Sequence, residues 1–253
     1  MQTILKYILL SGLRDRIYIG IFISLITTFS LSIFLGQTSL VENAQTTTAY
    51  IAGSSRFVII LGMILFVCLN INRAFENKEV EFILSKPISR EKFILSYLVG
   101  FLITATIIIL TMIAGIFIIV KIDKIGAIFW FTTLFLEMFI TISFAILASL
   151  ILKNSFSSIL SSLAFYLISR MMGIFVLAIN LPENISQLQN NFLPTILKII
   201  SIAFPRLDLF TQSSWLIYGV EDFSSMKIIF LQAAIYIPLM IFMAFHDFRK
   251  KQF

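Results

Sequence analysis

The chain has 253 residues, of which 59% are hydrophobic and 13% are charged, and its mean hydropathy is +1.00. A soluble protein of this length could not bury so much apolar surface, whereas lipid solvates it. The net charge of +6 is expected for the loops of a membrane protein, so it does not call for a nucleic-acid partner.

The chain begins with a short amphipathic stretch. Ile4, Leu5, Ile8 and Leu9 share one side of a helix, and Lys6 lies off that side. This pattern predicts a helix within residues 1–16 that lies on the inner membrane surface. A frayed apolar terminus is the alternative.

Six apolar runs of roughly membrane-spanning length follow. They cover residues 17–36, 57–72, 93–120, 127–152, 158–179 and 227–246. Each run lacks the alternation of a β-barrel strand, and a helix satisfies its own backbone in lipid. The sequence therefore predicts an all-α polytopic protein with six transmembrane helices, forming a single transmembrane domain over residues 1–253.

Basic residues set the predicted orientation. With the N-terminus inside, the inner segments hold twelve basic residues: Lys6, Arg14, Arg16, Arg73, Lys78, Lys86, Arg90, Lys92, Lys153, Arg249, Lys250 and Lys251. The outer segments hold six: Arg56, Lys121, Lys124, Lys198, Arg206 and Lys227. The bias predicts that both termini are cytoplasmic. Abundant Ile, Phe, Lys and Asn are typical of a low-GC bacterium, so the expected location is a bacterial cytoplasmic (inner) membrane.

The outer segments differ in character. Residues 37–56 are rich in Thr, Ser, Gln and Asn, and we expect a solvated loop there. Within 180–226, the apolar pieces 192–204 and 207–218 flank Pro205 and are too short to cross a bilayer. They predict helices at the outer interface, broken at the proline. Trp130 is expected in the outer aromatic belt.

The longest charged segment is the inner loop 73–92. Nine of its twenty residues are Lys, Arg or Glu. Its four Glu residues have no role in the positive-inside rule, so a docking surface for a soluble partner is favoured over a loop that only sets topology. Pro87 would end a preceding helix, and Ser89 is placed to cap the next one.

This loop resembles the first cytoplasmic loop of ABC-2 type permeases, the membrane subunits of ATP-binding-cassette exporters with a type V-like architecture. In that family a charged helix continues from span two into a Leu-Ser-x-Pro-(Ile/Val)-Ser-Arg turn, and here Leu84 to Arg90 match that turn. The sequence lacks the Gly that relatives often carry within 77–79, and Tyr97 stands where many have Lys. The six-span layout and the PRLDLFTQSSWLIYG stretch after residue 204 are also similar to the family.

The resemblance implies that residues 73–92 form a cytoplasmic coupling helix for an ATPase subunit. The expected contact residues are Arg73, Glu76, Glu79, Glu81, Ser85, Pro87 and Arg90. The sequence contains no G-x-x-x-x-G-K-[ST] motif, so ATP and magnesium would bind a separate ABC ATP-binding subunit. The resemblance also implies a second permease copy, identical or related, and contact with membrane lipids. No cofactor, metal site or catalytic residue of the chain's own is expected.

Two charges interrupt the apolar runs. Glu137 and Arg170 both fall well inside predicted spans, where an unpaired charge costs about 2.5–3.5 kcal/mol on insertion scales. Mutual pairing is therefore expected. The pair could line a transport path or a subunit interface, or it could be a structural ion pair between helices.

Two other function classes were compared with the permease. An integral-membrane enzyme is disfavoured, because the sole histidine, His246, lies near the tail and no Cys–His or Ser–His set is evident. A secondary transporter or assembly scaffold that needs no ATPase remains the alternative.

Overall fold

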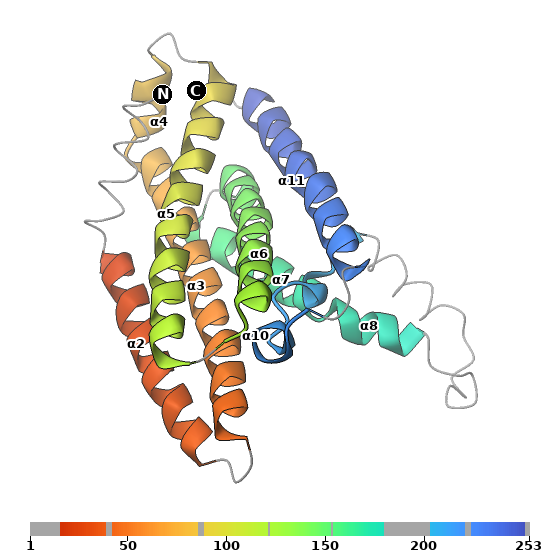
Figure 1. Ribbon diagram of the computed structural model, residues 1–253. Coiled ribbons are helices and arrows are strands. Elements are labelled where there is room, and N and C mark those ends of the chain that lie inside the picture. Colours follow the sequence, from red (N-terminus) through yellow and green to blue (C-terminus); the bar gives the residue numbers. More distant parts are fainter. Residues whose placement is uncertain are drawn as a thin grey trace.

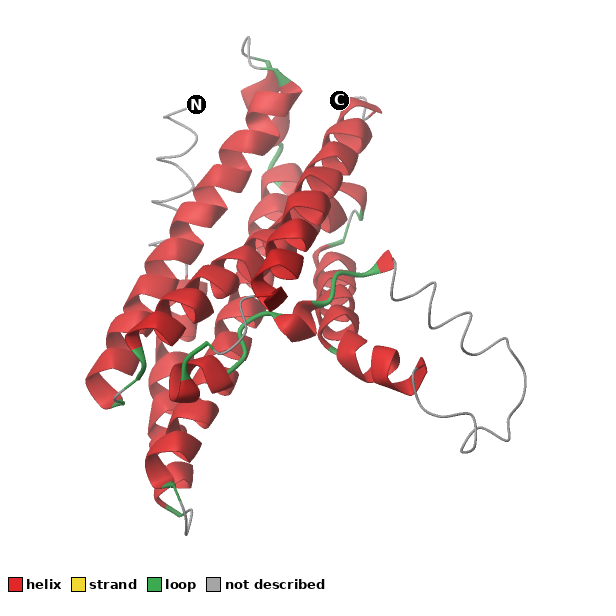
Figure 2. Ribbon diagram, turned by 45° about the vertical axis from the view of Figure 1, so that its right-hand side comes forward, coloured by secondary structure: helices red, strands yellow, loops and turns green. Residues whose placement is uncertain are grey.

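The computed structural model describes residues 16–38, 42–85, 89–120, 122–152, 154–179, 203–220 and 224–250. All regular structure in these ranges is helical, with no β-strand (Figure 2). The predicted all-α class is confirmed. The predicted surface helix within 1–16 lies outside the described residues, apart from Arg16, and so does most of 180–226.

Five of the described helices are long and apolar enough to cross a membrane. They are α2 (Arg16–Gln37), α3 (Asn43–Glu76), α5 (Arg90–Ile119), α6 (Lys124–Ile151) and α11 (Ser224–Lys250). This is the architecture of a multi-pass helical membrane protein. Pro238 lies inside α11, which a membrane helix tolerates because neighbouring groups satisfy the freed carbonyl.

The sixth predicted span, 158–179, is not one helix. It is divided at Met171 into α7 (Ser155–Arg170) and α8 (Met172–Ile179), and α8 projects away from the bundle (Figures 1 and 2). At 1.5 Å per residue α7 is only about 24 Å long, less than a hydrocarbon core. The prediction of six full-length spans is therefore wrong among the described residues.

Even so, α7 carries the chain far into the bundle. The start of α5 and the end of α11 are hydrogen-bonded together, so they share one end of the molecule. The start of α6 lies at the other end, where the Asp123 amide donates to the Leu216 carbonyl of α10 (Ser214–Tyr218) at 3.2 Å. After α6, α7 therefore leads back into the bundle, where Arg170 at its end donates to the carbonyls of Leu207 and Phe210.

The second span starts earlier than its apolar run suggested. Helix α3 begins at Asn43, so residues 43–56 are helical and the solvated loop predicted for 37–56 is wrong there. The polar side chains of this segment form hydrogen bonds within the helix. The Thr47 and Thr48 hydroxyls, for example, each donate to the main-chain carbonyl four residues earlier at 2.7 Å. Gly36 lets α2 approach α3 closely, because a Cβ at position 36 would lie 1.8 Å from the hydroxyl oxygen of Thr47 in α3.

Burial ranks the helices from centre to edge. In the apolar windows of α6 and α3, 72% and 61% of residues are buried, against 22% for α2 and α11. Helices α3 and α6 therefore form the centre of the bundle, while most residues in the apolar windows of α2 and α11 are not buried. Trp130, which was expected in an interfacial belt, is fully buried on α6. That prediction is wrong because the α10 segment covers this end of α6.

Candidate functional site

The charged segment after span two is not the continuous rod that the resemblance implied. Helix α3 ends at Glu76, and α4 (Glu79–Leu84) is a separate helix of six residues. Between them Lys78 adopts a left-handed conformation with φ 58°. Such a backbone conformation favours glycine. The bend therefore lies within residues 77–79, where the similar permeases often carry the Gly that this sequence lacks. Arg73 and Glu76 thus belong to one helix, and Glu79 and Glu81 to another.

Helix α4 has an inner and an outer side. Val80 is 1% exposed and lines a small cavity together with Phe75 and Phe93. Glu81 and Ser85 are exposed, and Phe82 exposes 67% of its surface. The exposure of Phe82 was not predicted from the sequence, because a single phenylalanine in a short helix is usually a core residue. A buried valine therefore seats α4 on the bundle and leaves acidic and aromatic groups facing outward.

Helix α5 begins six residues after the end of α4 and has a side-chain cap. The Ser89 hydroxyl accepts a hydrogen bond from the Lys92 amide at 3.4 Å, so the predicted N-cap is confirmed. Pro87, assigned to the partner contact, lies outside the described residues. Figure 1 shows α4 at the same end of the molecule as the start of α5 and the end of α11.

Arg90 makes a contact within the chain that the sequence did not predict. Its guanidinium Nη1 donates to the main-chain carbonyls of Phe248 at 3.1 Å and Arg249 at 2.9 Å. A basic side chain thus satisfies terminal carbonyls of α11. Arg249 in turn forms an ion pair with Glu91 of α5. Arg90 therefore ties α5 to α11, a role distinct from the partner contact assigned to it.

Aromatic packing reinforces this tie. The Phe248 ring is fully buried, stacks on Phe93 of α5 at 5.5 Å between centroids, and meets Phe75 of α3 edge-on at 6.4 Å. Such ring pairs contribute about 0.5–1.5 kcal/mol each beyond area burial. We call Phe75, Arg90, Phe93 and Phe248 the inner clamp. It joins the ends of three spans directly beneath α4.

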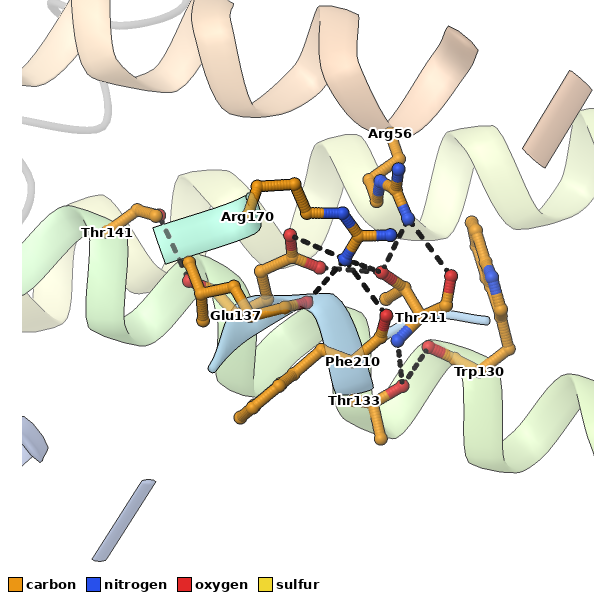
Figure 3. A network of polar contacts seen from close by, with 9 residues as sticks. Arg56, Trp130, Thr133, Glu137, Thr141, Arg170, Phe210 and Thr211 are labelled. Carbon is orange, nitrogen blue, oxygen red and sulfur yellow. Dashed lines mark hydrogen bonds and ion pairs between the residues drawn. The ribbon is translucent and has the colours of Figure 1, made fainter. Parts of the chain in front are cut away.

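The two intramembrane charges meet deeper in the bundle (Figure 3). Arg170 Nη1 lies 3.7 Å from Glu137 Oε1. Glu137 is fully buried on α6, and the Arg170 side chain is 24% exposed at the end of α7. The structure therefore brings together the two residues that sequence reasoning paired.

A threonine that the sequence did not single out connects the cluster. The Thr211 hydroxyl donates to Glu137 Oε2 at 2.7 Å, and the Thr211 amide donates to the Thr133 hydroxyl at 3.3 Å. Arg56 Nη1 of α3 donates to the Thr211 carbonyl at 3.0 Å and to its hydroxyl at 2.9 Å. Thr211 is fully buried with φ 49°, so these contacts hold it in a strained conformation.

Arg170 also satisfies irregular backbone. Its Nη1 donates to the carbonyl of Leu207, in the short 3₁₀ helix η2 (Leu207–Leu209), and to the Phe210 carbonyl at 3.0 Å. Of the outer interfacial helices predicted for 180–226, the described part consists of η2 and α10, and it is buried in the bundle at Leu207, Phe210 and Leu216. We call Arg56, Thr133, Glu137, Arg170 and Thr211 the polar cluster.

No sequence pattern marked Arg56 as part of this cluster, because it stands at the border of an apolar run and reads as an outer-loop charge. Among the residues that the structure describes, no group of three or more His, Cys, Asp or Glu side chains could hold a metal ion. Comparison of the chain with protein-family models and with curated proteins found no match.

Proposed function

We propose that the chain is the membrane-spanning permease subunit of an ATP-driven ABC exporter in a bacterial cytoplasmic membrane. It would move a substrate across or out of the inner membrane while a separate ATP-binding subunit hydrolyses ATP. A second copy of the chain, or a related chain, would complete the membrane part. Both termini, α4 and the inner clamp would face the cytoplasm.

The observation that carries this proposal is α4. It is a short acidic helix that follows the second span, is seated by buried Val80, and precedes the capped start of α5 in the chain. Its exposed Glu81 and Phe82 offer charge and apolar area to a soluble partner. Aromatic anchors with charged surroundings are typical of protein interfaces.

The inner clamp supplies a route for mechanical work. Force on α4 would reach α5 where Val80 lies beside Phe93, and Arg90 and Phe93 link α5 to α11. Since α4 bends away from α3 at Lys78, the push is not delivered along the axis of the second span. We infer that ATP-driven motion of the partner moves α5 and α11 together.

The test is co-purification from the native membrane in mild detergent. We expect the wild-type chain to bring down a polypeptide that hydrolyses ATP and carries a G-x-x-x-x-G-K-[ST] sequence. The double variant Glu79→Lys/Glu81→Lys should lower the recovered ATPase activity by about tenfold or more, because like charges replace opposite ones at the contact. Glu42→Lys, an exposed reversal at the α2–α3 connection, is the matched control and should leave recovery unchanged.

Two outcomes would contradict the proposal. If no ATP-hydrolysing chain accompanies the wild type, the protein is not the subunit of such an exporter. If the Glu79→Lys/Glu81→Lys variant brings down as much ATPase activity as the wild type, α4 is not part of the contact surface.

A further inference from the structure

The polar cluster carries more positive than negative charge. Arg56 and Arg170 both donate to the Thr211 hydroxyl, at 2.9 and 3.5 Å. Among the described residues, Glu137 is the one carboxylate in an ion pair with either arginine. Asp208 also acts electrostatically on Arg170, but it is paired with Arg206 at 2.9 Å, so those two charges cancel. Arg56 and Arg170 against Glu137 then leave an excess of one positive charge. Placing an uncompensated charge in a membrane domain is costly, so an additional anion would stabilise the arrangement.

Two buried hydrogen-bond donors without an acceptor lie at the polar cluster, one on its member Arg56 and one on the neighbouring Trp130. Trp130 is fully buried, and its Nε1–H has no hydrogen-bond partner. The same is true of the Arg56 Nε–H. Figure 3 shows both side chains beside Thr211. Glu137 Oε1, 3.7 Å from Arg170 Nη1, also lacks a hydrogen bond, but it is enclosed on the far side of the cluster's ion pair. A ligand that satisfies the two donors must supply acceptor oxygens.

The accessible side of the cluster is its cationic side. Glu137 is fully enclosed, whereas the Arg170 side chain is 24% exposed and Arg56 is half-buried. Arg56 lies 20 residues before the end of α3, which places it about 30 Å along the helix from α4. A ligand therefore meets the guanidinium groups first, from the part of the molecule far from the inner clamp.

The backbone at this site is irregular. Residues between η2 and α10 are not helical, yet Phe210 and Thr211 are fully buried. Within a membrane protein such backbone is tolerated where it is enclosed by protein or lines a polar cavity. Guanidinium groups are well suited to oxyanions because their planar donors match carboxylate and phosphate oxygens.

We propose that the polar cluster is a binding site for an oxyanion, a phosphate or carboxylate group, with Arg56 as its principal ligand and Trp130 Nε1 as a further donor. The anion balances the excess charge of Arg56 and Arg170. It comes either from a lipid headgroup or from a free solute. This inference goes beyond the permease proposal, because binding needs neither ATP nor an ATPase subunit.

The experiment measures thermal unfolding of the purified chain in a neutral detergent. Inorganic phosphate is titrated in one arm, phosphatidylglycerol in a second and neutral phosphatidylcholine in a third. We expect a saturable rise in the melting temperature with phosphate or phosphatidylglycerol, and none with phosphatidylcholine. A response to phosphate assigns a free solute, and a response to phosphatidylglycerol alone assigns a lipid headgroup.

Variants separate the site from general charge effects. Arg56→Gln should abolish the rise, and Arg56→Lys, which keeps the charge, should retain part of it. Arg206→Gln is the matched control, because Arg206 is already paired with Asp208 at 2.9 Å in the same segment, and it should respond like the wild type. The absence of any anion response in the wild type, or an undiminished response in Arg56→Gln, would overturn the proposal. If Arg56→Gln fails to fold, Arg56→Lys decides the question. A rise in melting temperature with the anion that is larger for Arg56→Lys than for the wild type would also overturn the proposal.

Discussion

Thr211 shows how single residues hold the centre of this protein together. Its hydroxyl both donates to Glu137 and accepts from two arginines, while its amide bonds to Thr133. A buried group that loses its partner costs about 1–3 kcal/mol, and more when it is charged. The cluster is therefore a coupled unit, in which each removal leaves other groups unsatisfied.

A double-mutant cycle tests that coupling. Arg170→Gln removes the ion-pair partner of the buried Glu137 carboxylate and should lower the free energy of unfolding by about 3–5 kcal/mol. Glu137→Gln should cost less, because Arg170 keeps its bonds to the Leu207 and Phe210 carbonyls. The double variant should be more stable than Arg170→Gln alone. Denaturant unfolding in mixed micelles measures all three, and additive effects within about 0.5 kcal/mol would contradict a coupled pair.

The pair Glu137 and Arg170 could be predicted because charges stand out in apolar runs, and only a few partners are possible within a bilayer. The roles of Arg56 and Thr211 could not be predicted. Arg56 stands at the border of an apolar run, and Thr211 belongs to a stretch whose sequence predicts an interfacial helix. Their roles depend on contacts between residues 155 positions apart in the chain. No local pattern encodes such a contact.

At the scale of elements, the inner clamp decides how the ends of α3, α5 and α11 are fixed. Phe248→Ala removes a fully buried ring between Phe75 and Phe93 and should destabilise the protein by about 3–5 kcal/mol. Thermal unfolding in detergent measures the loss. Phe242→Ala is the control on the same helix, because that ring is 69% exposed and should leave the melting temperature nearly unchanged. Equal effects of the two substitutions would show that Phe248 is not part of a packed junction.

Helix boundaries were predicted well where apolar runs end at charges or caps. The runs at 17–36 and 127–152 correspond closely to α2 and α6. The break at Met171 was missed because its cause is distant: Arg170 turns to the carbonyls of the η2 segment, and a Cβ at Gly173 would lie 2.7 Å from Asp208 Oδ2. The bend at Lys78 was missed because a lysine seldom marks a left-handed position.

At the scale of the whole molecule, hydropathy predicted a helical membrane protein, and five of the six predicted spans lie in long apolar helices, which satisfy their own backbone groups in lipid. The proposed function requires more than this. Helix α4, the inner clamp and the C-terminal end of α11 must all face the cytoplasm, and the α2–α3 connection and α10 must face outward.

The most direct test of the account is therefore the sidedness of α4. Ser85 is exposed at the end of α4, Tyr218 is 64% exposed at the end of α10, and the native Cys68 is fully buried. Ser85→Cys and Tyr218→Cys, each in a Cys68→Ser background, would be labelled with a membrane-impermeant maleimide in vesicles of known orientation. We predict labelling of Ser85→Cys only from the cytoplasmic side and of Tyr218→Cys only from the outer side. Labelling of Ser85→Cys from the outer side would contradict the account, because no cytoplasmic ATPase could then reach α4.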